Sequence, residues 1–167
     1  MSAIDGLLAA NRRWAASRAG DAAPAAPALR VAVVACMDAR LDVHAALGLR
    51  AGDAHVIRNA GGAVTDDVIR SLAISQRRLG TREVALIHHT DCGMMSITDE
   101  GLRAEIERET GIRPPWAVEA FDDLDADVRQ SIARVLASPF IPHRDAVRGF
   151  VYDVHTGLLR EVASERG

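Results

Sequence analysis

The hydrophobic pattern of the chain alternates short apolar runs with stretches of helical spacing. Nearly continuous apolar runs of this length are typical of parallel strands that are covered on both faces. Three such runs occupy residues 29–35, 54–57 and 84–87. Between the last two, residues 65–79 repeat apolar side chains near a 3.6-residue period, with Thr65 as a suitable N-cap and Gly80 as a suitable end. This order predicts an α/β fold with a central, mostly parallel sheet flanked by helices.

The first part of the chain predicts a helix on an arm. Residues 3–18 have helical periodicity, and Ser2 can cap their N-terminal end. Residues 20–27 contain two prolines and favour an extended linker. The apolar face of this helix must be buried on the rest of the chain or on a second subunit, and the pattern leaves both open. That face carries Ile4, Leu7 and Leu8.

The last third of the chain is acidic and helical in pattern at first and then alternates apolar and polar residues. An acidic stretch at 98–127 predicts a helix that contains Leu102 and Ile106 and stops at Gly111, and residues 118–136 predict one or two more. Alternating segments at 149–154 and 158–162 flank a turn and predict a terminal hairpin or an edge strand. We expect a single domain over 1–167, made of a helical arm at 1–28, an α/β core at 29–95, and a helical segment with C-terminal strands at 96–167.

Composition narrows the functional classes. The 167 residues are 49% hydrophobic and 26% charged, with a net charge of −3, so nucleic acid and membrane surfaces are not expected partners. All 20 basic residues are arginines, which excludes Schiff-base and P-loop lysines. The chain has no apolar run long enough to span a membrane, and its first residues lack the pattern of a secretory signal. We therefore expect a cytoplasmic protein whose two cysteines are reduced.

The two cysteines each follow a predicted strand. Cys36 ends the first apolar run, and Cys92 comes shortly after the third, with His89 three residues before it. The carboxyl ends of parallel strands lie at one edge of a sheet, so these side chains can converge if the strands are neighbours. Two thiolates and one imidazole suit a zinc ion and leave its fourth position open. The alternative is that both cysteines are small buried residues without a metal.

Asp38 and Arg40 follow Cys36 in the same loop. An aspartate beside zinc can either complete the ligand set or accept a proton from metal-bound water, and a bidentate contact with Arg40 would hold it away from the metal. A surface ion pair is the alternative. A thiol enzyme with Cys36 as nucleophile and His89 as base is disfavoured, because Asp38 would repel an oxyanion and the spacing to Arg40 is too short for the usual anion loop.

These motifs resemble the β-class carbonic anhydrases, most closely their short actinobacterial members. The resemblance runs over about residues 30–95 and rests on Cys-Met-Asp-Ala-Arg at 36–40, Arg-Asn-Ala-Gly at 58–61 and His-Thr-Asp-Cys at 89–92. It departs from the family at Ala39, where serine is more common. It implies reversible hydration of carbon dioxide to bicarbonate and a proton by attack of zinc-bound hydroxide. The implied site has one Zn²⁺ per chain on Cys36, His89 and Cys92, with Asp38 and Arg40 as the catalytic dyad.

The resemblance also implies a homodimer or a higher oligomer formed through the N-terminal helix. Carbon dioxide is small and apolar, so we expect a pocket of apolar groups and backbone, with Gly61, Gly62 and Gly93 as candidate lining residues. Two alternatives keep the metal. One is a carbonyl sulfide or carbon disulfide hydrolase, and the other is a non-catalytic zinc protein in which Asp38 closes the site.

The remaining histidines are not expected to bind the metal. Strand alternation points His88 away from the side of His89, which favours a place in the core or behind the ligands. We expect surface or packing roles for the others, and the sequence does not identify a proton shuttle among them. These residues are His44, His55, His143 and His155.

Overall fold

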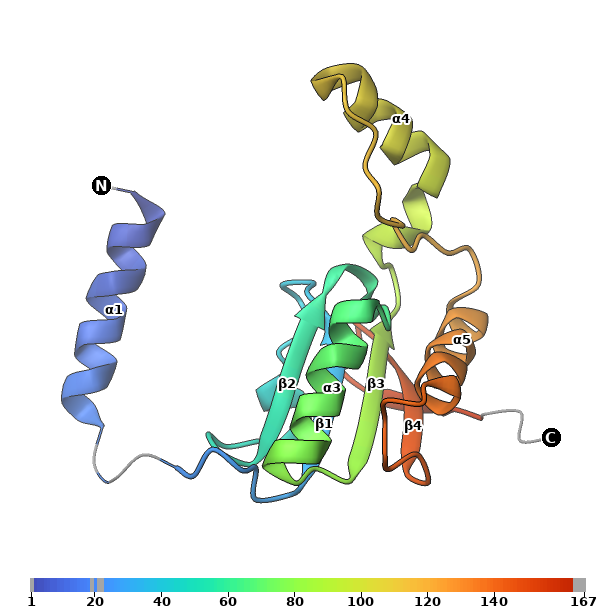
Figure 1. Cartoon of the computed structure of the whole chain (residues 1–167). Helices are drawn as coiled ribbons and strands as arrows, with labels where there is room; N and C mark the ends of the chain where they lie inside the picture. The colour runs from blue at the N-terminus through green and yellow to red at the C-terminus, as the bar shows by residue number, and fades with distance from the viewer. Residues whose placement is uncertain (1, 19, 21–22, 164–167) are drawn as a thin grey trace.

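The computed structural model describes residues 2–18, 20 and 23–163, and its centre is a five-stranded sheet (Figure 1). The strand order is β2-β1-β3-β4-β5, and the first four strands are parallel while β5 is antiparallel to β4. This arrangement confirms the predicted mostly parallel α/β sheet and its C-terminal edge hairpin. The strands are β1 (Val31–Cys36), β2 (Ala54–Asn59), β3 (Glu83–His89), β4 (Val147–Tyr152) and β5 (Leu159–Val162).

The central strand β1 is buried along nearly its whole length, which explains its unbroken apolar sequence. It pairs with β2 on one side and with β3 on the other. The register places Cys36 opposite Asn59 of β2 and Ala35 opposite Ile87 of β3. The carboxyl ends of these three strands therefore lie together at one edge of the sheet.

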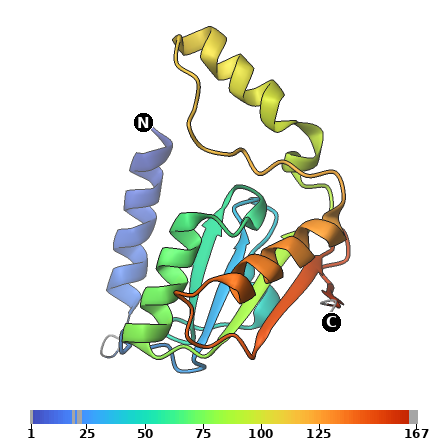
Figure 2. The ribbon, with the colours of Figure 1, turned by 45° about the vertical axis from the view of Figure 1, so that its right-hand side comes forward.

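Two helices, α3 (Asp66–Leu79) and α5 (Leu124–Ala137), cover the same face of the sheet (Figures 1 and 2). Thr65 caps α3 and Gly80 ends it in a left-handed conformation, as the sequence predicts. The α5 helix begins at Leu124 after an Asp123 cap, so the expectation of helix from residue 118 is wrong for the first six positions. The cap explains the late start, because its carboxylate accepts the N–H of Ala126.

The two faces of the sheet are covered unequally. The larger hydrophobic cluster lies between the sheet and the helices α3 and α5, and it includes Leu72 of α3, Ile132 of α5 and Leu86 of β3. The opposite face carries a smaller cluster around the short helix α2 (Val43–Leu47). Gly149 of β4 lets α5 approach the sheet closely, because a methyl group there would overlap Val128 and Ile132.

Two helices stand away from this body (Figures 1 and 2). The α1 helix (Ala3–Ser17) has the predicted Ser2 cap in a full capping box, yet no described residue of α1 is buried. Its apolar side chains are exposed, with Ile4 at 67%, Leu7 at 69% and Trp14 at 58%. The rest of the chain, as far as the structure describes it, therefore does not cover this face. The second projecting helix is α4 (Asp99–Thr110), which also has no buried residue.

Two short 3₁₀ turns follow strands of the sheet: η1 (Ala60–Gly62) comes after β2, and η2 (Gly93–Ser96) comes after β3. Both turns lie at the carboxyl edge of the sheet and contact each other. No helix in the described part of the chain is long and apolar enough to cross a membrane.

Candidate metal centre

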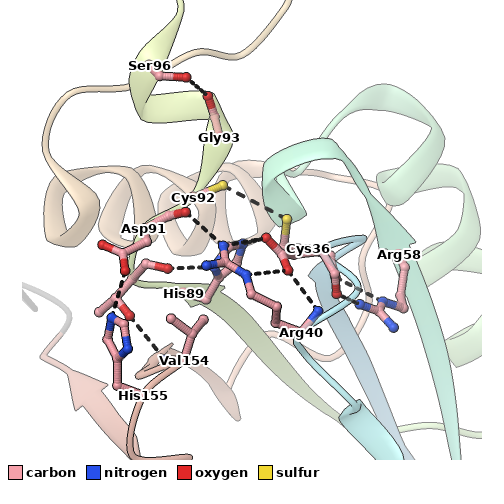
Figure 3. A network of polar contacts seen from close by, with 12 residues as sticks. Cys36, Arg40, Arg58, His89, Asp91, Cys92, Gly93, Ser96, Val154 and His155 are labelled. Carbon is pink, nitrogen blue, oxygen red and sulfur yellow. Dashed lines mark hydrogen bonds and ion pairs between the residues drawn. The ribbon is translucent and has the colours of Figure 1, made fainter.

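Three potential metal ligands converge at the carboxyl edge of the sheet (Figure 3). Cys36 is the last residue of β1, His89 is the last residue of β3, and Cys92 opens the turn that follows. Their ligating atoms lie within 4.8 Å of one another, and the two sulfur atoms are 4.0 Å apart. All three side chains are buried. The parallel pairing of β1 and β3 thus brings together groups that are 56 residues apart in sequence.

The imidazole of His89 is oriented as a ligand. Its Nδ1 atom lies 2.8 Å from the carbonyl oxygen of Thr90, so Nδ1–H donates there and Nε2 carries the lone pair. The Nε2 atom is buried and has no hydrogen-bond partner. Burying a polar nitrogen without a partner costs free energy, and a metal ion bound to Nε2 would remove that cost.

The two thiols also fit a cation. In the pair without metal, the hydrogen bond between the sulfurs lowers the pKa of Cys36 and raises the pKa of Cys92, because they share one proton. A divalent ion would displace that proton and bind both sulfurs as thiolates. Two sulfurs and one imidazole nitrogen form a zinc-type donor set, so the residues present fit zinc.

Asp38 is held by Arg40 at the side of this cluster. Arg40 donates from Nε to Oδ1 over 3.0 Å, from Nη2 to Oδ2 over 2.8 Å, and from its backbone N–H to Oδ1 over 2.8 Å. These bonds, the side-chain ones first, hold the pKa of Asp38 well below its usual range. Asp38 Oδ2 is 3.6 Å from His89 Nε2. The carboxylate is therefore ionised and adjacent to the metal position.

Further hydrogen bonds fix the loop that carries Asp38. Arg40 Nη2 donates to the carbonyl oxygen of Asp91 over 2.9 Å, which joins the β1 loop to the β3 loop. Arg58 at the end of β2 donates to the carbonyl oxygens of Cys36 and Asp38, over 2.9 and 2.7 Å. The Arg-Asn-Ala-Gly motif at 58–61 contains Arg58 but predicts no role for it. Arg58 precedes Asn59, whose pairing with Cys36 is visible only in the structure.

The three candidate pocket glycines have different surroundings. Gly62 has a φ of +71°, and a Cβ there would lie 2.9 Å from the backbone nitrogen of Cys36. Gly61 faces Met94 and Phe121, whereas a Cβ on Gly93 would meet nothing within 4 Å. A cavity of about 590 Å³ lies beside the cluster, and its lining includes Asp91, Cys92 and Gly93. Gly62 thus packs behind Cys36, and Gly93 lies on the open side.

The other histidines are placed mostly as expected. His88 is 0% exposed and points to α5, where its Nδ1 lies 2.9 Å from Asp127 Oδ2 and its Nε2 lies 3.4 Å from Ser131 Oγ. His155 differs from the other non-ligand histidines, because its Nε2 lies 2.8 Å from Asp91 Oδ2, next to the ligand Cys92. The remaining ones are His44 on α2, His55 with Ser75, and His143 with Arg82.

Comparisons with known proteins agree on one family. The sequence pattern of the family described as carbonic anhydrase matches residues 31–159. The chain is 55% identical to β-carbonic anhydrase 1 of Mycobacterium tuberculosis over 162 residues, which cover 97% of this chain and 99% of the relative. It is 38% identical to a carbon disulfide hydrolase of Acidithiobacillus thiooxidans, over 78% of this chain and 76% of the relative.

A solved structure supports the same relationship. The crystal structure of carbonic anhydrase from Streptococcus mutans superposes with a TM-score of 0.92 at 44% sequence identity. The match covers 98% of this chain and 99% of that one. The similarity therefore includes the projecting helices as well as the sheet.

Proposed function

The chain belongs to the β-carbonic anhydrase family, and we propose that it hydrates carbon dioxide reversibly to bicarbonate and a proton at the site formed by Cys36, His89 and Cys92. The observation that carries this assignment is the buried cluster of two thiols and an unpartnered imidazole nitrogen, with an ionised aspartate beside it. A zinc ion bound there supplies the Lewis acidity that makes water nucleophilic near neutral pH. The protein's own residues hold the ion and orient the reactants.

The ligand residues have distinct tasks. Cys36 and Cys92 give the metal position two negative charges, and His89 gives a neutral donor whose ring is fixed by Thr90. The thiolate charges offset the charge of the ion and weaken its effect on water, compared with three neutral histidines. We therefore expect the rate of hydration to rise between about pH 7 and about pH 8.5.

Asp38 orients water, and Arg40 orients Asp38. With its oxygens engaged by Arg40, Asp38 stays ionised and can accept a hydrogen bond from the attacking water at Oδ2, the oxygen nearer to His89. This contact aims an oxygen lone pair at the substrate. Arg40 is in turn fixed by the carbonyl oxygen of Asp91, so the whole dyad is positioned before substrate arrives.

The Asp38–Arg40 contact favours an open site over a closed one. In a non-catalytic zinc protein, Asp38 would complete the ligand set and exclude water. That arrangement requires Asp38 Oδ2 to leave Arg40 Nη2, which it contacts at 2.8 Å. The bidentate pair therefore supports a catalytic site with a fourth position for water.

Hydrolysis of a sulfur analogue is the second candidate activity. The named carbon disulfide hydrolase has a lower identity to this chain, 38% against 55%, over a smaller share of both proteins. The same orienting residues would serve either substrate. The preference for carbon dioxide thus rests on the closer and nearly full-length relative.

The exposed face of α1 supports assembly into a homodimer or higher oligomer. Ile4, Leu7 and Trp14 form an apolar face that the rest of the described chain leaves uncovered. A second copy that buries this face would remove it from water. We also assign the protein to the cytoplasm, because two unpaired thiols at a metal site persist in a reducing compartment.

The proposed function is tested by measuring the products of two substrates with the same preparation of protein. Protein with about one zinc ion per chain is supplied separately with carbon dioxide and with carbon disulfide, and bicarbonate and hydrogen sulfide are measured. Hydration of carbon dioxide with little sulfide supports the proposal. Sulfide production without hydration would favour the second candidate, and neither activity on zinc-loaded protein would favour a closed metal site.

A further inference from the structure

Hydration releases one proton for each bicarbonate formed, and this proton must leave the site before the next turnover. The residues around the metal position are poorly suited to carry it. Both oxygens of Asp38 are engaged by Arg40, and Arg40 itself is a permanent cation. His89 uses one ring nitrogen for Thr90 and offers the other to the metal. A separate group that binds and releases protons near neutral pH is therefore needed.

We propose that His155 is the proton-transfer residue of this enzyme, positioned by Asp91 at the mouth of the metal site. This inference rests on the proposed hydration of carbon dioxide. His155 Nε2 lies 2.8 Å from Asp91 Oδ2, and the carbonyl oxygen of the same Asp91 accepts a hydrogen bond from Arg40 Nη2 (Figure 3). One residue thus connects the catalytic dyad to an imidazole whose side chain is 75% exposed to solvent.

The turn that carries His155 is anchored to the loop of the metal ligands. The backbone N–H of Val154 donates to Thr90 Oγ1 over 3.1 Å, and the N–H of Thr90 donates to the carbonyl oxygen of Tyr152 over 2.9 Å. The N–H of His155 donates to Asp153 Oδ1 over 2.8 Å. These contacts hold the β4–β5 turn against the end of β3, so His155 keeps its place beside Asp91.

Space for bridging waters lies beside Asp91. The cavity of about 590 Å³ is lined by the ligand Cys92 and by Asp91, the partner of His155. It is large enough to hold several waters. In the proposed transfer, a proton released at the metal position passes through water in this cavity, beyond Asp91, to Nδ1 of neutral His155, while Nε2–H keeps its hydrogen bond to Asp91 Oδ2. The new Nδ1–H bond then breaks when buffer takes the proton, and the imidazole returns to its starting form.

Charges around His155 suit a transient cation. Asp91 faces it from the end of β3, and Asp153 faces it from its own turn. The nearest cation in the network is Arg40, which contacts the backbone of Asp91 and not its carboxylate. Among the histidines of the described chain outside the ligand set, His155 alone joins this network, since the others contact α5, Ser75 or Arg82, or lie on α2.

The test separates proton transfer from the chemistry of carbon dioxide. In stopped-flow assays with little buffer, we expect His155→Ala to lower kcat about tenfold and to leave kcat/KM for carbon dioxide unchanged. Added imidazole should restore kcat. The variant His155→Gln keeps a donor for Asp91 but cannot carry a proton, so it should show the same loss. His44→Ala removes an exposed histidine on α2 and is the matched control.

A second readout does not depend on activity. Long-range proton–nitrogen NMR reports which ring nitrogen of His155 carries hydrogen, and we expect the Nε2–H form at about pH 8.5, with redistribution in Asp91→Ala. Unchanged kcat in both His155 variants at low buffer, or an Nδ1–H ring in the wild type, would overturn the proposal. Wild-type protein that hydrates no carbon dioxide would instead overturn the proposed function.

Discussion

Arg40 binds both carboxylate oxygens of Asp38, from Nε to Oδ1 over 3.0 Å and from Nη2 to Oδ2 over 2.8 Å. The same Oδ2 lies 3.6 Å from His89 Nε2, the nitrogen that faces the metal position. Asp38 thus lies close enough to the cluster to compete for the metal position if Arg40 releases it. By holding Asp38, the guanidinium of Arg40 keeps the fourth ligand position free for water.

Replacing Arg40 should therefore close the site. In Arg40→Leu we expect zinc to remain at about one ion per chain, while hydration falls about 100-fold or more because Asp38 occupies the position of water. The visible spectrum of cobalt-substituted protein reports the change in ligands. The double variant Arg40→Leu/Asp38→Ala should lack that spectral change, and its appearance there would show that Asp38 is not the added ligand.

The backbone of Cys36 depends on a neighbouring glycine. In Gly62→Ala, the new methyl group would lie 2.9 Å from the Cys36 nitrogen and 3.1 Å from the Ile87 carbonyl oxygen, at a φ of +71°. We expect a loss of about 2–5 kcal/mol in the free energy of unfolding, together with weaker zinc binding. Chemical denaturation and metal analysis measure both effects.

Gly93→Ala is the control for that substitution. Nothing lies within 4 Å of a Cβ at Gly93, and its φ is not in the left-handed region. It should unfold at nearly the wild-type denaturant concentration and bind zinc normally. Equal destabilisation by the two substitutions would contradict the account of Gly62.

The oligomer should depend on the apolar face of α1. Leu7→Glu and Leu8→Glu place charges on side chains that are exposed in the single chain, so a monomeric protein would tolerate both. If a second copy covers them, the charges would be buried without partners. Light scattering coupled to gel filtration should then show a smaller assembly, whereas Arg13→Glu on the opposite face should not change it. An unchanged mass for the leucine variants would rule out assembly through this face.

Asp99, the first residue of α4, binds the segment at 118–120 that follows this helix. Its carboxylate accepts the N–H groups of Ala120 over 2.9 Å and Val118 over 3.0 Å, which lowers the pKa of Asp99. Because the pKa of Asp99 is lowered by folding, the stabilisation from these hydrogen bonds is fully present above the pKa of aspartate in the unfolded chain, about 3.9. It is lost as the pH falls through the lower, folded value.

Asp99→Ala should release that segment near neutral pH. We expect faster amide hydrogen exchange at Val118 and Ala120, and little change in the sheet, because the donors lose their acceptor. Glu105→Ala removes an exposed carboxylate from the same helix and serves as the control. Exchange that is equal in both variants would show that Asp99 does not hold the segment.

The sheet and the zinc-type cluster follow from local sequence features. Apolar runs define β1 and β3, and two cysteines and a histidine at their carboxyl ends can converge if these strands are neighbours, a condition that the β1–β3 pairing meets. The caps of α1 and α3 are equally local, because a capping side chain acts within three residues. The strands and the caps need no information from distant parts of the chain, whereas the cluster also needs the pairing of β1 with β3.

Other features depend on contacts that no local pattern encodes. Arg58 reaches the carbonyl of Cys36 across 22 residues, and His155 reaches Asp91 across 64. Arg58 belongs to the Arg-Asn-Ala-Gly motif, but neither motif nor periodicity reveals which distant groups Arg58 and His155 contact. The start of α5 was misplaced because residues 118–123 carry apolar side chains but are held by Asp99 and the Asp123 cap in a non-helical path.

The most direct test is stopped-flow hydration of carbon dioxide by zinc-quantified protein at about pH 7 and about pH 8.5, with Cys92→Ala measured alongside. We expect catalysis that increases at the higher pH and disappears in Cys92→Ala together with the bound zinc. A wild-type protein that carries about one zinc ion per chain and shows no hydration at either pH would contradict the proposed function.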